Sequence, residues 1–377
     1  MHFSLLVLVL ATLLALPVAA QQPLELELVG EVQFGVDPRY NTGGSDVWGY
    51  TAPDGSEYAI MGILNGVAIV AVPSLDIVDI IPGPKEDDPY YHRDMVVHGD
   101  MLYVVAENTG TNEGLQIIDL GGLPESARLV TTYATDAHVR SHNLDVDAVT
   151  GMLYVLAQDY TGVRIVDASD PERPRDVGFV PAPDLHDIHA RGDTLWVAEG
   201  RSPTFAIWDV ADPQNPRQIV QMQVPKSGYV HNIWPTDDGR HVVTTEETLD
   251  KTVKVWDVSD PEDVELVGEY LGANRLAHNA HVRGDLVFLS HYAAGVTVID
   301  ISDPTAPVEV ARYDTYPASD SSNFVGTWGA FPYTAGGYLY ASDLEGKLTV
   351  LRVKHTTSSA LPPERSEPLQ ERQGTPK

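Results

Sequence analysis

Short segments in which apolar and polar residues alternate recur along the whole chain, as in half-buried β-strands. One such segment repeats with little change: Val163-Arg-Ile-Val-Asp167 returns as Val296-Thr-Val-Ile-Asp300. Its seven copies begin at Gly66, Gly114, Gly162, Phe205, Thr252, Gly295 and Gly346. From Asp119 through Asp167, Asp209 and Asp257 to Asp300, the steps are 48, 42, 48 and 43 residues. This period is typical of a four-stranded propeller blade.

The repeated segment is the third strand of a unit that also contains two earlier strands and one later strand. In the middle copies it ends in Asp and an Asp-Pro turn, as in Asp257-Val-Ser-Asp-Pro261, which reverses the chain into the outer strand. No segment has a convincing helical period, so the sequence predicts an all-β, seven-bladed β-propeller. The units run Ser45–Gly83, Tyr91–Asp136, Ser141–Pro183, Leu185–Val224, Tyr229–Gly272, Ala277–Tyr316 and Phe324–Val353.

The two ends of the repeat region complement each other. Leu24–Phe34 alternates like an outer strand and resembles Val264–Glu269, yet no other strand of a unit precedes it. The last unit stops after its third strand, near Val353. We therefore expect the N-terminal strand to supply the missing fourth strand and to close the ring as a single domain over residues 26–354.

The segments outside this domain predict export. Residues 1–20 hold an apolar run followed by Val18-Ala19-Ala20, which indicates a signal peptide cut near Ala20; a retained membrane anchor is the alternative. Residues 355–377 are polar and proline-rich, so we expect a disordered tail. No later segment is long and apolar enough to span a membrane. The expected location is periplasmic or extracellular.

The amino-acid composition limits the kinds of partner that the protein can bind. The chain has 54 acidic and 24 basic residues, a formal net charge of -30, which argues against nucleic acid or an anionic membrane as a partner. It has no cysteine, so an exported form depends on its buried core rather than on disulfides.

A histidine recurs at the start of the first strand in five units. These are His92, His142, His186, His231 and His278. Each second strand runs back towards the same rim and ends in a polar residue, so we expect the two sets to converge at the channel mouth. Among these second-strand residues, the candidate ligand-binding side chains are Glu107, Glu199, Glu246 and His291.

Two interpretations of the histidines stay open. Imidazole with carboxylate and without thiolate suits a divalent transition metal such as zinc, copper, iron or manganese. Alternatively, a residue needed in every copy for packing also recurs, and a buried hydrogen-bond role predicts that repetition better than a site with three or four ligands. Trp48, Trp234 and Trp328 occupy matching first-strand positions and are more typical of inter-blade core than of a ligand platform.

The third-strand motif resembles the LVIVD repeat. With His142-Asn143, His231-Asn232 and His278-Asn279 at its first strands, the chain is similar to the choice-of-anchor B family of exported bacterial proteins. The resemblance implies a repeat propeller and no activity for particular residues. The family is named for varied C-terminal surface anchors, and because residues 355–377 show no hydrophobic or sorting-like stretch, we do not expect surface attachment.

Two functions follow as hypotheses. We favour a non-catalytic scaffold that binds an extracellular ligand or protein through its rim loops. The alternative is a metal-dependent hydrolase or lyase, in which the recurrent histidines hold the metal and Glu199 or Glu246 is the base.

Overall fold

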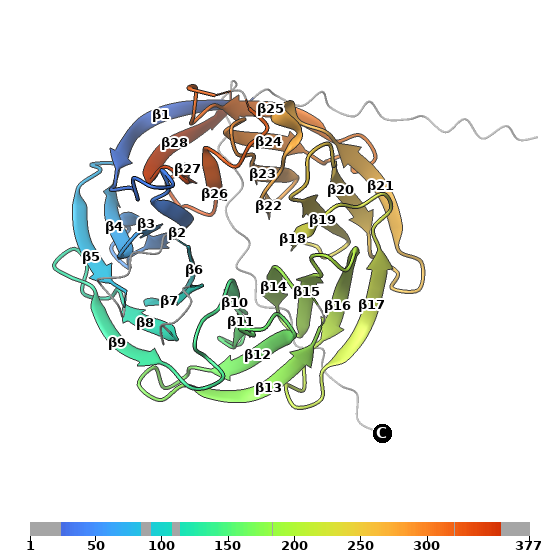
Figure 1. Cartoon of the computed structure of the whole chain (residues 1–377), viewed down its shortest axis with the longest axis horizontal. Coiled ribbons are helices and arrows are strands. Elements are labelled where there is room, and N and C mark those ends of the chain that lie inside the picture. The colour runs from blue at the N-terminus through green and yellow to red at the C-terminus, as the bar shows by residue number, and fades with distance from the viewer. Residues whose placement is uncertain (1–23, 84–91, 108–113, 183, 320, 356–377) are drawn as a thin grey trace, which may run out of the picture.

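Strands arranged in seven four-stranded antiparallel sheets surround a central axis, each sheet forming one blade (Figure 1). The structure is a computed structural model that describes residues 24–83, 92–107, 114–182, 184–319 and 321–355. The predicted all-β, seven-bladed propeller is confirmed. The predicted signal peptide and the tail beyond residue 355 lie outside the described residues.

Blades are numbered by their first strand along the chain, and within each the strands run outward from the axis. Blades 1 to 4 comprise β2 (Gly44–Thr51), β3 (Glu57–Ile63), β4 (Gly66–Val72) and β5 (Ile77–Pro82); β6 (Arg93–His98), β7 (Met101–Ala106), β8 (Leu115–Asp119) and β9 (Arg128–Tyr133); β10 (Leu144–Val146), β11 (Leu153–Leu156), β12 (Gly162–Asp167) and β13 (Arg175–Pro181); and β14 (Ile188–Arg191), β15 (Thr194–Ala198), β16 (Thr204–Asp209) and β17 (Arg217–Gln223).

The remaining blades follow the same order. Blades 5 to 7 comprise β18 (Val230–Pro235), β19 (His241–Glu246), β20 (Val253–Asp257) and β21 (Glu265–Tyr270); β22 (Ala280–Arg283), β23 (Leu286–Ser290), β24 (Val296–Asp300) and β25 (Val308–Tyr313); and β26 (Thr327–Phe331), β27 (Tyr338–Asp343), β28 (Lys347–His355) and β1 (Leu24–Gln33). A short 3-10 turn, Ala273–Arg275, precedes β22. Within the described ranges, no helix is long and apolar enough to cross a membrane.

The N-terminal strand closes the ring as the sequence predicts. β1 pairs antiparallel with β28 from Leu24↔His355 to Gln33↔Lys347, so strands from opposite ends of the chain complete blade 7 (Figure 1). His355, which we expected to begin the tail, is the last residue of β28.

A bulge in the outer strand recurs in every blade. In blade 3, Ile165 pairs with Gly178 and Val166 with Asp176, which leaves Val177 as the extra residue. The equivalent extra residues in the seven blades are Val29, Val78, Val130, Val177, Ile219, Val267 and Val310. Since β1 has the same bulge at Val29, it has the local geometry of a true fourth strand, and the bulge adds twist where the blade curves around its neighbour.

The hydrophobic core lies between blades. One cluster, for example, joins Ile165 of blade 3 to Val197 of blade 4, and another joins Leu26 of β1 to Phe288 of blade 6. Each blade is therefore stable only between two neighbours, which makes closure at β1 a condition for the whole ring.

Two leucines in β1 allow a matched test of this closure. Leu26 is buried in the blade 6–blade 7 core, whereas Leu28, on the same strand, is 44% exposed. We expect Leu26→Ala to lower the free energy of unfolding by about 2 to 4 kcal/mol, and Leu28→Ala to change it by less than about 0.5 kcal/mol. Urea denaturation measures both; equal effects would contradict the role assigned to β1.

Candidate functional site

The five recurrent histidines form a continuous arc of rings at the start of the first strands. Successive ring centroids are 4.3 Å apart for His92 and His142, 4.3 Å for His142 and His186, 4.0 Å for His186 and His231, and 4.4 Å for His231 and His278. Trp328 of blade 7 completes the circle, because its ring lies 4.4 Å from His278 and 5.4 Å from His92. The sequence-predicted histidines thus meet at one place.

Two of these imidazoles link neighbouring blades. Nδ1 of His186 lies 3.2 Å from the His231 carbonyl oxygen, and Nδ1 of His278 lies 2.6 Å from the Trp328 carbonyl oxygen. Because a carbonyl only accepts, each Nδ1 carries the proton and donates it. Such bonds are what the structural interpretation of the repeat predicts.

Amide side chains that follow the histidines add a second set of links. Asn143 donates to Asp94 of the preceding blade (3.0 Å) and accepts the Ile188 N–H of the next blade (3.1 Å). Asn232 repeats this arrangement with Asp187 (3.2 Å) and the Ala280 N–H (3.1 Å). The amides of Asn143 and Asn232 therefore hold first strands to one another.

Three carboxylates lie within this network: Asp46 and Asp187 are buried, and Asp94 is half-buried. Burial raises the pKa of Asp46 to about 7, although its carboxylate accepts the N–H groups of Val47 and Met95. Burial, with the charges of Asp46 and Asp187, raises the pKa of Asp94 well above its ordinary value. Burial alone would do the same to Asp187, but His186 reverses this and lowers its pKa. Asp187 is therefore the one of the three that is fully charged at neutral pH.

The histidines of the arc differ in protonation state. Burial alone would lower the pKa of His186, but the Asp187 carboxylate, 3.0 Å from its Nδ1, raises it above the ordinary value. Burial lowers the pKa of His278 to about 3, and burial with the neighbouring imidazoles holds the pKa values of His92 and His231 well below the ordinary value. The latter three are neutral at pH 7, the form in which imidazole binds a metal.

Two glutamates reach the histidine arc from the ends of second strands. Glu107 lies 3.1 Å from Nδ1 of His142. Glu247 lies 3.7 Å from Nε2 of His231 and 3.8 Å from Nε2 of His278. The structure thus brings Glu107 to the histidines as expected, whereas Glu247 was missed because its neighbour Glu246 was chosen.

The other nominated side chains lie away from the arc. Glu246 pairs with Lys254 on β20 and accepts the Gly228 N–H, and Glu199 accepts hydrogen bonds from Thr204 (2.5 Å) and Gln221 (2.9 Å) of its own blade. Both carboxylates are therefore engaged by groups outside the histidine arc, and neither is placed as the base that we expected. His291 is buried against Gly272, and burial lowers its pKa to about 4.

A second layer of rings lies deeper along the first strands. His189 packs on Trp234 at 4.0 Å, Trp234 on His281 at 4.3 Å, and His281 on Trp48 at 5.8 Å. Trp48 and Trp234 thus belong to this layer, but Trp328 lies in the histidine arc, so the expected match of the three tryptophans is wrong. Because β18 has the same bulge at His231 as β26 has at Trp328, Trp328 is the counterpart of His231, and Phe331, 4.9 Å from Trp48, is the counterpart of Trp234.

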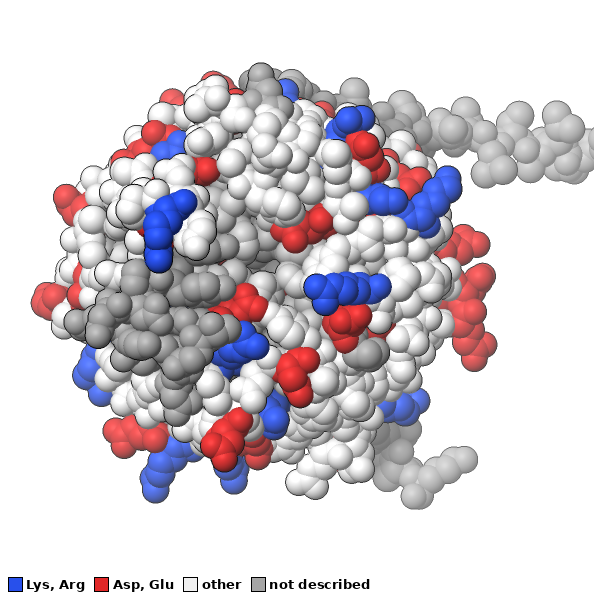
Figure 2. Space-filling view, in the orientation of Figure 1, with Lys and Arg blue, Asp and Glu red and all other residues white. Residues whose placement is uncertain are grey.

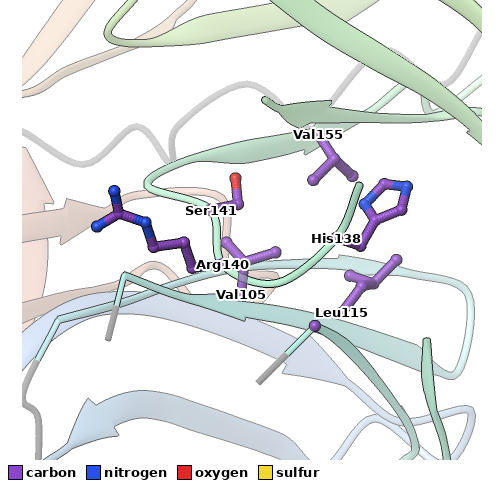
Figure 3. A pocket seen from close by; sticks show the side chains of 7 residues that line it. Val105, Leu115, His138, Arg140, Ser141 and Val155 are labelled. Carbon is purple, nitrogen blue, oxygen red and sulfur yellow. The ribbon is translucent and has the colours of Figure 1, made fainter. Parts of the chain in front are cut away.

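A pocket between blades 2 and 3 offers no ligand cavity. It is lined by Val105, Leu115, Arg140, Ser141 and Val155 with His138 and Gly114, and these side chains leave no room in it for a water molecule (Figure 3). The imidazole of His138 is engaged by Asp176 at 2.6 Å.

The face of the ring drawn in the space-filling view carries charges of both signs. Figure 2 shows acidic and basic side chains interspersed over this side of the ring.

The fold and the repeat define a β-propeller of repeated blades, and comparisons with known proteins agree. The LVIVD repeat matches residues 274–315, which cover blade 6. No curated protein matches the sequence.

Solved structures of similar fold are propellers of distant sequence. "Structure of U3-55K" has a TM-score of 0.64 at 12% identity over 88% of this chain and 98% of that one. The RRP9 WD40 repeats give 0.63 at 12% over 89% and 99%, and the Myceliophteria thermophila Cps50 (Swd1) β-propeller domain gives 0.61 at 12% over 88% and 100%. At this identity the likeness extends to the fold alone.

The buried Asp46 makes stability depend on pH. Its pKa is about 7 in the folded state against an ordinary value of 3.8, so folding favours the proton, and the stability present below pH 4 is lost as pH rises towards 7. We expect Asp46→Asn to be more stable than wild type at pH 8, by up to about 4 kcal/mol, with a smaller gain at pH 5. Urea denaturation at both pH values measures this. Asp54→Asn, at an exposed carboxylate, is the control and should show no such trend; a gain for Asp46→Asn that is the same at both pH values would contradict the account.

Proposed function

We propose that the protein is a non-catalytic binding module that holds a protein partner over the mouth of its central channel. The observation that carries this proposal is a set of large apolar side chains exposed on loops at that end of the ring. They are Tyr40, Leu249, Leu271 and Phe324. Exposed apolar side chains on a rigid scaffold are typical of protein–protein interfaces.

The loops that carry these side chains are held in place. The Asp250 N–H donates to the Arg275 carbonyl (2.9 Å), and the two side chains form an ion pair at 2.9 Å, which ties the loop of Leu249 to that of Leu271. Phe324 packs edge-on against Tyr292 at 5.1 Å. A surface ordered in advance loses less entropy on binding, which favours recognition.

We further propose that the chain is exported and belongs to the choice-of-anchor B family. The apolar N-terminal segment with its small-residue end supports export, and the LVIVD match supports the repeat. The excess of acidic residues supports a partner other than nucleic acid. Cell fractionation with N-terminal sequencing tests export: a mature chain that starts near Gln21 outside the cytoplasm is expected, and an intact cytoplasmic chain would refute it.

Photo-crosslinking tests the binding face. Phe324 is 56% exposed at the mouth end, and Val149 is 70% exposed in the turn between β10 and β11 at the other end. With benzoylphenylalanine in each position in turn, we expect a discrete crosslinked protein band from position 324 in the exported fraction of the native host. Position 149 is the control, and equal labelling from both positions, or none from 324, contradicts the proposal.

A metal-dependent hydrolase or lyase is the second candidate. The observation in its favour is that Glu107 and Glu247 lie beside imidazoles in the arc. Such an enzyme requires bound metal, so a chain that retains no zinc after titration would remove this candidate and leave the binding module standing.

A further inference from the structure

Two groups of side chains in the histidine arc have the same composition. One consists of His92, Glu107 and His142, the other of His231, Glu247 and His278. In each group one nitrogen of each histidine and one carboxylate oxygen all lie within 4.8 Å of one another.

The two groups are also built in the same way. Each takes a histidine from the start of a first strand and the glutamate just after the second strand of the same blade, and adds the histidine of the next blade. The first group joins blades 2 and 3, and the second joins blades 5 and 6. The histidines therefore correspond in fold position, whereas Glu247 lies one residue further along its chain than Glu107, since Ala106 pairs with Arg93 and Thr245 with Asn232.

A tyrosine from the second blade of each pair donates its hydroxyl to the glutamate. Tyr160 donates to Glu107, and Tyr292 donates to Glu247. Both tyrosines follow a second strand and have left-handed backbone, with φ of 58° and 44°. A bulky residue is strained in this conformation, and such strain is concentrated at functional sites. Orientation of a carboxylate by an outer hydrogen-bond donor is typical of metal sites.

In the second group, the lone pair of an imidazole nitrogen faces the glutamate. Because Nδ1 of His278 donates to the Trp328 carbonyl, Nε2 carries the lone pair, and this buried nitrogen has no hydrogen-bond partner among the described residues. It lies 3.8 Å from a Glu247 oxygen, and Nε2 of His231 lies 3.7 Å from the other. A buried lone pair facing a carboxylate oxygen is unfavourable unless a proton or a metal cation lies between them.

We propose that the channel mouth carries two like sites for a divalent first-row transition-metal ion, His92–Glu107–His142 and His231–Glu247–His278, each spanning a blade boundary. Metal–ligand bonds of about 2.0 to 2.2 Å in tetrahedral geometry place ligand atoms roughly 3.4 Å apart, so the separations of 3.7 and 3.8 Å need only small movements. Two imidazoles and one carboxylate suit zinc, copper, nickel or iron and leave an open position. This inference does not depend on the identity of a protein partner.

A third group, His142, His186 and Asp187, is not assigned a metal. Nδ1 of His186 already lies within hydrogen-bond distance of Asp187 and of the His231 carbonyl, so the ion pair satisfies this group without an added cation. His186 thus separates the two sites along the arc.

Zinc counting with isosteric variants tests the proposal. Tag-free full-length protein is stripped with EDTA, titrated with ZnCl₂ by calorimetry, and assayed for bound zinc after gel filtration. We expect two ions per wild-type chain, one in Glu107→Gln, one in Glu247→Gln and none in the double variant, because a carboxamide replaces the charged ligand without changing its shape. Glu199→Gln is the matched control: Glu199 ends the second strand of blade 4 but is bonded within its own blade, so this variant should keep two ions.

Any other wild-type count overturns the two-site assignment, as does a Glu247→Gln protein that binds as much zinc as wild type. Circular dichroism and thermal melting check that each variant is folded. If Glu247→Gln does not fold, Tyr292→Phe removes only the hydroxyl donated to Glu247 and should weaken zinc binding at this site by roughly tenfold or more; unchanged affinity would contradict the proposal. X-ray absorption of the loaded protein should show nitrogen and oxygen ligands with imidazole scattering.

Discussion

Pairing between β1 and β28 is the interaction on which the rest of the structure depends. A strand from the start of the domain completes the sheet at its end, so the two termini hold each other in register over the whole of β1. Without this pairing, blade 7 has three strands, and the core between blades 6 and 7 loses Leu24 and Leu26. Since each core cluster is shared by neighbouring blades, an open boundary weakens both of its sides.

Closure also explains why the centre can hold so many polar groups. A ring fixed at its circumference brings seven first strands together, and their side chains satisfy one another across blade boundaries, as Asn143 does between Asp94 and Ile188. The arrangement costs stability, because Asp46 is buried, Asp94 is half-buried, and both have raised pKa values. Such buried carboxylates and unpartnered imidazole nitrogens are characteristic of sites kept for binding rather than for stability.

The sequence predicted the blades because their signals are local and repeated. The third-strand motif, the Asp-Pro turns and the unmatched Leu24–Phe34 strand each specify a neighbour along the chain, so the seven blades and their closure followed directly. The convergence of the histidines followed from the same geometry, because first strands of a propeller start at one rim.

The details of the site were harder to predict from the sequence. Glu246 and Glu247 are adjacent, and which of them meets the histidines depends on where β19 ends and on Lys254, which holds Glu246. Trp328 occupies the position of the recurrent histidine in its blade, and Phe331 that of Trp234, so matching the three tryptophans misaligns blade 7 by three residues. A further usable signal is an aromatic ring three residues after the recurrent position, as in His186 and His189 or His231 and Trp234, which marks the second layer.

Because the chain has no cysteine, an engineered disulfide tests closure most directly. Glu27 and Arg352 are direct partners in the β1–β28 register, whereas Glu27 and Lys354 are diagonal neighbours, beyond the usual span of a disulfide. The account predicts that Glu27→Cys with Arg352→Cys oxidises to an intramolecular bond in nearly every molecule, and that Glu27→Cys with Lys354→Cys does so far less. Failure of the direct pair to form the bond, or equal yields from both pairs, would contradict closure of the ring by its first strand.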